Sequence, residues 1–123
     1  MFNFIFVALG GALGAMGRYA ISLVPVKSFF PFLTLVTNIG GAVVIGFIAG
    51  AVSVKEGTPP GLVLFLKVGV CGGFTTFSTF SLELFNLLEQ GKAAAGVLYA
   101  GLSVVCCVLS VYLGQMMAVR TFR

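Results

Sequence analysis

Four long apolar runs constrain this chain more than any other feature. They cover roughly residues 2–24, 32–54, 62–88 and 93–119. A helix needs about 20 mostly apolar residues to cross the hydrocarbon core of a bilayer, and each run is long enough. The joints between them, PVKSFFP, KEGTPPG and EQGK, carry the proline, glycine and charge that are typical of turns. The sequence therefore predicts a single all-α domain, residues 1–123, with four transmembrane helices.

The composition agrees with a membrane location. Hydrophobic residues make up 59% of the chain and charged residues only 8%, whereas a soluble domain usually carries about 25% charged residues. So few charges cannot coat a water-facing globule. The N-terminal run lacks a basic region before it and continues too far for a signal peptide. We therefore expect a multi-pass protein of a bacterial-type inner membrane.

Several kinds of chemistry are excluded by what the chain lacks. It has no histidine and no aspartate, and its three acidic residues are Glu56, Glu83 and Glu89. Histidine-based mechanisms are therefore excluded and paired-carboxylate mechanisms almost entirely so, and we expect no enzyme activity. The net charge of +4 is spread along the chain, which suggests anchoring at the membrane surface rather than binding of nucleic acid. The three cysteines lack the spacing of a zinc site, and we interpret them as small buried apolar residues.

Lysine and arginine are divided almost evenly between the two ends of the predicted helices. Four spans place both termini on one side, together with Lys55, Lys67, Arg120 and Arg123. The other side carries Arg18, Lys27 and Lys92. Because the distribution of these charges largely sets orientation, four against three barely selects one. Such a chain could insert in both directions and pair antiparallel with its own copy, and the alternative is a modest preference for termini inside.

Three pairs of glycines have the GxxxG spacing of closely packed membrane helices. The pairs are Gly10–Gly14, Gly46–Gly50 and Gly69–Gly73. Small residues at this spacing let two helix backbones approach each other. Because four helices alone do not easily enclose a path, we interpret the three pairs together as favouring an oligomer.

The third apolar run contains an unusual stretch, GVCGGFTTFSTF, at residues 69–80. Its glycines permit a break in the helix before the pair Thr75 and Thr76. A broken membrane helix exposes backbone carbonyls and helix-end amides, which is tolerated only inside protein or along a cavity. Free carbonyls can coordinate a cation such as Na⁺, whereas amides at a helix N-terminus favour an anion. The alternative is that the glycines only allow close packing.

If a helix is drawn from Thr75 onward, it has two different faces. An aromatic face holds Phe77, Phe80 and Leu84, and an opposite polar face holds Thr75, Thr79, Glu83 and Asn86. A carboxylate inside a span is a candidate functional group, although a partly wet glutamate near the end of the span is the alternative. The rings fit ordinary core packing, but their positive edges could also contact a dehydrated small anion without a cation that would trap it.

Polar residues also occur in the second and fourth runs. Asn38 lies between one and two turns into the second run, where it serves either as a helix-packing hydrogen bonder or as a donor to a permeating anion. Tyr99, Ser103 and Ser110 share one face of the fourth run. That face is either a polar track or a set of interhelical hydrogen bonds.

These motifs resemble those of the small fluoride channels of the Fluc (CrcB) family. GGALGAMGRY resembles the first-helix motif, TLVTNIGGAVVIGF the second and GVCGGFTTFSTF the third, in the same order and spacing over nearly the whole chain. The resemblance implies an antiparallel, dual-topology homodimer with two pores. It also implies passive, fluoride-selective export that relieves fluoride toxicity.

The resemblance further implies roles for individual residues. Gly72 and Thr75 match the positions whose carbonyls hold a structural Na⁺ at the dimer axis. Cys107, one turn after Ser103, stands where relatives can have a hydroxyl, which is a departure from the pattern. Among the predicted fluoride-pore residues, Arg18 matches a basic residue near the vestibule, and the alternative for it is an interfacial anchor whose charge reaches the membrane surface. The residues that match fluoride-pore or polar-track positions are Asn38, Phe77, Ser78, Thr79, Phe80, Glu83, Tyr99 and Ser103.

Two rival functions come from other classes of protein. A small multidrug exporter, which is also four-spanning, needs an acid in its first span to bind cations, and residues 2–24 contain none. A non-selective, holin-like membrane scaffold would not need the two-faced glycine, threonine and phenylalanine segment. Selectivity for fluoride would require a few well-placed donors that replace its water in a narrow path, with closely spaced rings to exclude the larger chloride.

Overall fold

The fold is all-helical, with four membrane-length helical segments. A computed structural model describes the whole chain, residues 1–123. The first two segments are α1 (Phe2–Ser22) and α2 (Phe32–Val54), and the last is α6 (Ala93–Phe122). The third spans Pro60–Glu89. All four are long and apolar enough to cross a membrane, which confirms the predicted multi-pass architecture. The predicted bounds agree with the observed helices to within three residues.

The third segment is not one regular helix. It consists of α3 (Pro60–Val63), the π-helix η1 (Leu64–Cys71), α4 (Gly72–Phe74) and α5 (Phe77–Glu89). Between α4 and α5, Thr75 and Thr76 are extended, with φ/ψ of −80°/156° and −148°/117°. The predicted break is therefore present, and it lies at the threonine pair itself. The eight-residue π-helix was not anticipated from the sequence.

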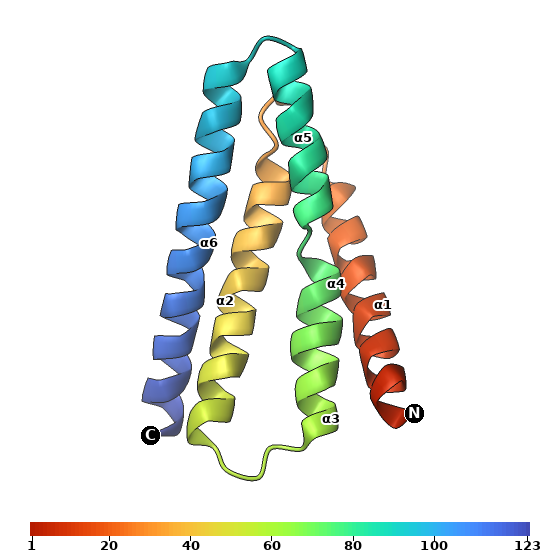
Figure 1. The fold of residues 1–123 in the computed structure, drawn as a ribbon, viewed down its shortest axis with the longest axis vertical. Helices are drawn as coiled ribbons and strands as arrows, with labels where there is room; N and C mark the ends of the chain where they lie inside the picture. The colour runs from red at the N-terminus through yellow and green to blue at the C-terminus, as the bar shows by residue number, and fades with distance from the viewer.

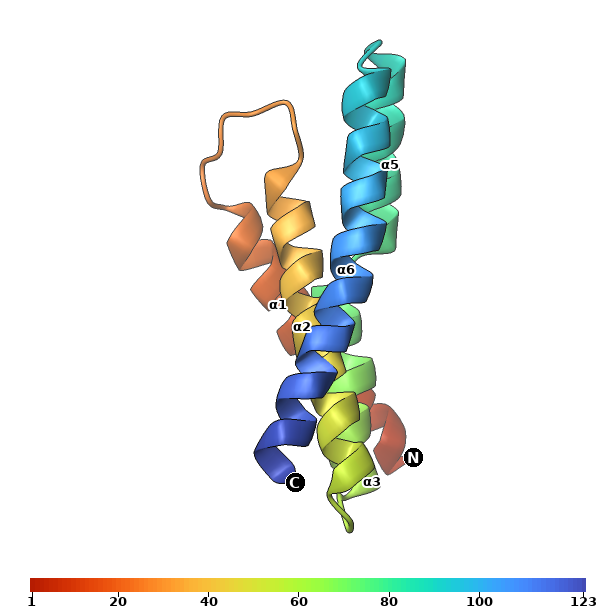
Figure 2. The same ribbon diagram turned by 90° about the vertical axis from the view of Figure 1, so that its left-hand side faces the viewer.

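Both termini lie at the same end of the molecule, together with the joint between α2 and α3 (Figure 1). The joints at the two ends of the third segment turn through Gly57 and Gly91, whose φ values of 77° and 73° lie in the left-handed region that favours glycine. At the opposite end, α1 and α2 diverge from α5 and α6, so the four segments form no parallel-sided bundle (Figure 2).

The helices pack as two pairs. α2 packs chiefly against α6, and α1 packs chiefly against η1 and α4. The predicted GxxxG glycines make these contacts, because a Cβ added at Gly14 would lie 2.2 Å from the Val70 carbonyl oxygen and one at Gly46 would lie 2.2 Å from that of Val111. The three spacings are thus used inside one chain. They cannot also be counted as evidence for an oligomer, as the sequence had suggested.

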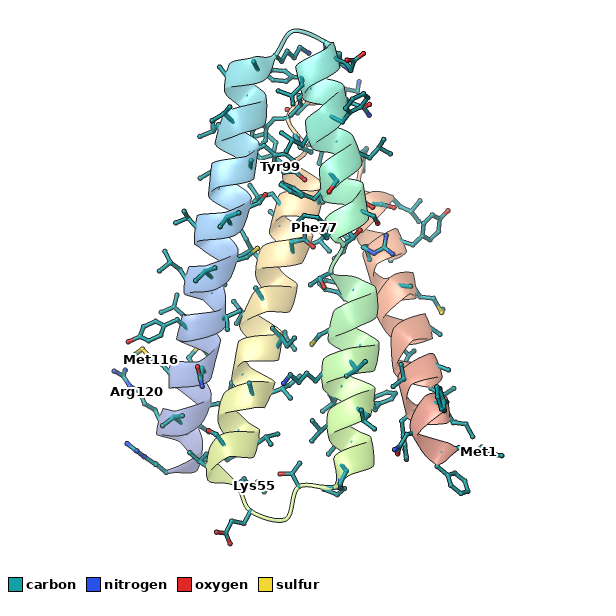
Figure 3. The ribbon with its side chains drawn as sticks, in the orientation of Figure 1. Met1, Lys55, Phe77, Tyr99, Met116 and Arg120 are labelled. Atoms are coloured by element: carbon teal, nitrogen blue, oxygen red, sulfur yellow. The ribbon has the colours of Figure 1, made fainter.

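A small apolar cluster joins α2, α5 and α6 in the half of the molecule that lies away from the termini (Figure 1). Leu35 of α2, Phe80 and Leu87 of α5, and Tyr99 of α6 form this cluster, and Tyr99 is completely buried. Figure 3 shows Tyr99 between α6 and α5 and Phe77 at the start of α5, whereas Met116 and Arg120 project outward from α6. The break between α4 and α5 therefore lies close to this cluster, because Phe80 belongs to the first turn of α5.

Candidate functional site

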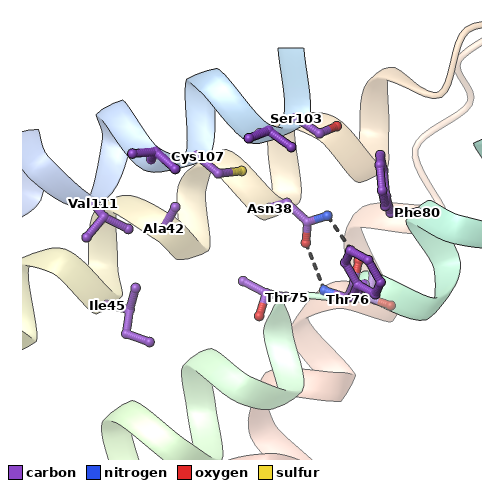
Figure 4. Close-up of a pocket in the computed structure, with 12 residues that line it drawn as sticks. Asn38, Ala42, Ile45, Thr75, Thr76, Phe80, Ser103, Cys107 and Val111 are labelled. Atoms are coloured by element: carbon purple, nitrogen blue, oxygen red, sulfur yellow. Dashed lines mark hydrogen bonds between the residues drawn. The ribbon is translucent and has the colours of Figure 1, made fainter. Parts of the chain in front are cut away.

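A side chain of α2 binds the backbone at the break. Asn38 donates a hydrogen bond from Nδ2 to the Thr76 carbonyl over 3.1 Å, and its Oδ1 accepts from the Thr76 amide over 2.8 Å (Figure 4). An amide side chain can pair with an extended backbone in this way because it offers one donor and one acceptor side by side. Asn38 therefore supplies the hydrogen bonds that the Thr76 amide and carbonyl would otherwise make within a continuous helix.

Thr76 also starts the helix that follows. Its Oγ1 accepts from the Thr79 amide over 3.1 Å, so Thr76 is the N-cap of α5. Since Thr75 and Thr76 are extended, the prediction that Thr75 shares a helical face with Thr79 and Glu83 is wrong. The helix begins at Phe77, two residues later than that prediction assumed.

An open groove of about 420 Å³ lies beside the break, and we call it the aromatic groove. Phe77 and Phe80 enter it from α5, with ring centroids 5.5 Å apart and planes inclined by 43°. The Phe77 ring is 80% exposed, whereas Phe80 is buried against Tyr99. No charged side chain lines this groove. Its lining residues are Asn38, Ala42, Ile45, Thr75, Thr76, Phe77, Phe80, Ser103, Val104, Cys107, Val108 and Val111.

Ser103 is the least satisfied polar group of the aromatic groove. The residue is 9% exposed, and its Oγ atom is buried without any hydrogen-bond partner. A buried hydroxyl without a partner costs about 1–3 kcal/mol of stability. Cys107 lies one turn further along α6, and Figure 4 shows its sulfur pointing toward Asn38. The groove therefore contains an unused hydroxyl and a thiol, a weaker hydrogen-bond donor.

A second, more enclosed space of about 310 Å³ lies on the other side of Thr76, and we call it the polar cavity. Thr76 is the only residue that lines both spaces. The two spaces follow the predicted separation of Phe77 and Phe80 from Thr79 and Glu83 on α5, but the junction of both spaces at Thr76 was not predicted. The cavity is lined by Arg18, Tyr19, Ser22, Leu33, Thr34, Thr37, Thr76, Thr79 and Glu83.

Glu83 is held by hydroxyl groups from two other helices. Thr34 donates to its Oε1 over 2.7 Å, and the Tyr99 hydroxyl donates to its Oε2 over 2.8 Å. A carboxylate with both oxygens engaged is an oriented acceptor within the fold. Glu83 is nevertheless only partly buried, so a partly wet glutamate, the alternative weighed from the sequence, is compatible with these two hydrogen bonds.

The candidate residues are therefore distributed over several environments. Asn38, Phe77, Phe80 and Ser103 line the aromatic groove, while Arg18, Thr79 and Glu83 line the polar cavity. Tyr99 lines neither space, because it is fully buried with its hydroxyl on Glu83. Ser78 also lines neither, and it is exposed on the first turn of α5. Ser110 is buried on α6 outside the groove.

Three functional candidates were missed by sequence reasoning. Thr76 joins the two spaces, Thr34 holds Glu83, and Thr37 is buried in the wall of the polar cavity. Thr76 could have been found, because threonine is a favoured N-cap residue and Thr76 directly precedes the helix that begins at Phe77. The other two carry no such local signal.

The fold and the site together define a small four-span integral membrane protein with a broken third segment and two polar spaces beside the break. The model of the family described as CrcB-like protein, Camphor Resistance (CrcB), matches residues 5–115. The chain therefore belongs to the CrcB-like protein family, as the resemblance of its motifs predicted.

Curated relatives match over nearly the full length. A protein of Hyphomonas neptunium named fluoride-specific ion channel FluC is 44% identical, over 99% of this chain and 99% of its own. Proteins of the same name from Shewanella halifaxensis and Ruminiclostridium cellulolyticum are 43% and 45% identical, over 99% and 96% of this chain and 100% and 93% of their own. These relatives are named for ion conduction and not for catalysis.

Proposed function

We propose that this chain forms a fluoride-selective channel for passive export of fluoride across a bacterial-type inner membrane. The observation that carries the proposal is Ser103, a buried hydroxyl without a partner, in a groove that contains no charge. Such a hydroxyl is available to an anion that has lost its water. The names of relatives at 43–45% identity agree with the same ion.

Other donors near the aromatic groove add to the set that a small anion could contact. The Asn38 amide nitrogen carries two hydrogens, and only one of them is needed for the Thr76 carbonyl. The amides of Phe77 and Ser78 belong to the first turn of α5, where amides have no acceptor within the helix and the helix dipole favours negative charge. The edges of the Phe77 and Phe80 rings add positive charge without a trapping cation.

Fluoride flux from liposomes tests this function directly. Purified protein in liposomes loaded with fluoride or chloride should release fluoride and retain chloride. Ser103→Ala should slow fluoride release by about tenfold, the effect of losing one hydrogen bond to a charged group. Ser53→Ala is the matched control, because Ser53 is on α2 outside the groove and bonds its own helix at Gly50. Equal release of both anions would instead favour a non-selective scaffold, and no release would end the channel proposal.

The proposal includes an antiparallel, dual-topology homodimer. The aromatic groove is open to the surface, and Phe77 is 80% exposed. A partner copy that covers this face would enclose the path, which four helices do not enclose alone. The charge count supports both orientations. Lys55, Arg120 and Arg123 lie at the end with the termini, and Lys67 lies in that half of the third segment. Arg18, Lys27 and Lys92 lie on the other side.

A structural Na⁺ at the dimer axis is the last part of the proposal, with the Gly72 and Thr75 carbonyls as its ligands. In a continuous helix the amides of Thr76 and Thr79 would bond these two carbonyls. Instead, the Thr76 amide donates to Asn38 and the Thr79 amide donates to Thr76 Oγ1. Two hard oxygen ligands from each copy would suit a monovalent cation such as Na⁺ better than Zn²⁺.

Removal of Na⁺ checks this assignment. After prolonged exchange into a large organic cation, we expect the dimer to dissociate more readily and fluoride flux to stop, because unsatisfied carbonyls in an apolar setting cost several kcal/mol each. Both should return when Na⁺ is restored, as measured by size-exclusion chromatography and flux. Identical dimer stability and flux in the two cations after full exchange would leave the glycines with a packing role only.

A further inference from the structure

Arg18 reaches from the first helix to the break in the third segment. Its Nε donates a hydrogen bond to the Gly73 carbonyl over 3.2 Å. The two backbones are in contact at this level, because a Cβ added at Gly14 would lie 2.7 Å from the Phe74 nitrogen, and one at Gly73 would lie 2.4 Å from the Gly11 carbonyl oxygen. The root of the Arg18 side chain is therefore fixed relative to α4.

Side chains from two different helices bind separate backbone carbonyls at the break: one donor comes from α1 and the other from α2. Arg18 of α1 takes the Gly73 carbonyl, and Asn38 of α2 takes that of Thr76. The amides that would otherwise close on Gly72 and Thr75 are used elsewhere. The Gly73 and Thr76 carbonyls are thus held by side chains, whereas those of Gly72 and Thr75 have lost their helical partners and are oriented by the backbone alone. The orientation of α4 against α5 depends on both holding contacts.

We propose that Arg18 is a positioning residue, which sets the geometry of the break and thereby the placement of the α5 amides and the Phe77 ring along the ion path. Because Arg18 Nε donates to the Gly73 carbonyl, the planar guanidinium is held in one orientation relative to the break. Lysine cannot reproduce this, since its ammonium is a compact charge on a flexible stem. The inference rests on the proposed function and assigns Arg18 a role different from that of a general anchor or a source of positive charge.

A source of positive charge would behave differently in transport. A cation beside the path raises the local concentration of anions, so its loss weakens conduction at low fluoride and is overcome at high fluoride. A distorted break leaves every passing ion with a poorer path, so the loss persists at saturating fluoride. Plots of current against fluoride concentration in planar bilayers separate the two roles, through the plateau current and the half-saturating concentration.

The experiment compares Arg18→Lys and Arg18→Gln with the wild type. We expect both variants to lower the plateau current by about tenfold, as loss of one charge-assisted hydrogen bond predicts, with the half-saturating concentration unchanged. Lys27→Gln is the control for charge, because Lys27 is exposed in the α1–α2 joint near the same end. It should leave the plateau unchanged.

Each other outcome overturns the inference. A wild-type plateau in Arg18→Lys, with only a raised half-saturating concentration in Arg18→Gln, would make Arg18 a source of charge. Failure of both variants to assemble would mean that Arg18 holds the whole fold and not the path. Absence of fluoride current in the wild type would instead refute the proposed function, so the two failures are distinguishable.

Discussion

Replacing Phe77 with isoleucine is expected to reduce fluoride efflux from liposomes by about tenfold or more, because an aliphatic side chain has no positive edge to offer an anion. Phe77 is the better of the two rings to test. It is 80% exposed in the aromatic groove, whereas Phe80 packs on Tyr99 with centroids 5.0 Å apart. Phe80→Ile would therefore also weaken the fold, and a lower efflux would have two causes.

Phe85→Ile is the matched control for this substitution. Phe85 is on the same helix, is 57% exposed and does not line the groove. It should conduct as the wild type does. Efflux from Phe77→Ile equal to that of Phe85→Ile, with both proteins equally assembled, would show that the ring does not contact the ion.

The second large effect is expected in the packing of α2 on α6. A Cβ added at Gly114 would lie 2.1 Å from the Val43 carbonyl oxygen and 2.8 Å from the Phe47 nitrogen. These atoms belong to backbone and cannot move aside cheaply. Gly114→Ala should therefore lower the free energy of unfolding by about 1–3 kcal/mol or more, the usual cost of overpacking. Thermal denaturation in detergent, followed by loss of monodisperse protein, measures this.

Gly101→Ala tests whether the effect is steric. Gly101 is also on α6, but a Cβ there meets nothing within 4 Å. Because alanine favours helix by about 1 kcal/mol over glycine, Gly101→Ala should be neutral or slightly stabilising. If the two substitutions lower the unfolding temperature equally, the α2–α6 contact is looser than the structure shows.

The four spans could be predicted because hydropathy acts on each segment separately. The same holds for the break, since glycines beside a threonine pair are a local signal. The π-helix Leu64–Cys71 had no such signal. Its conformation accompanies the close contact of Gly10 with Gly69, where a Cβ on Gly10 would meet Gly69 Cα at 2.9 Å. That contact depends on two helices at once.

The sequence predicted which residues belong to the candidate site better than it predicted which of them contact each other. Phe77 and Phe80 were chosen from the third-run motif and Asn38 from the second-run motif, and all three line the aromatic groove. Helical periodicity placed Thr75 on the wrong side, because it assumed that the helix continued through the threonine pair. The pairing of Asn38 with Thr76 joins residues 38 positions apart, and spacing along one helix cannot reveal such a contact.

The pairing of helices also determines when the chain can fold. The main partner of α1 is η1, in the third segment, and the main partner of α2 is α6, which is last. The first two helices scarcely touch each other, and the joint between them forms a wide arc (Figure 2). During membrane insertion, α1 and α2 must therefore remain as separate helices, with their glycine faces exposed to lipid, until the second half of the chain has entered. Assembly of this protein is a late event that the C-terminal helix completes.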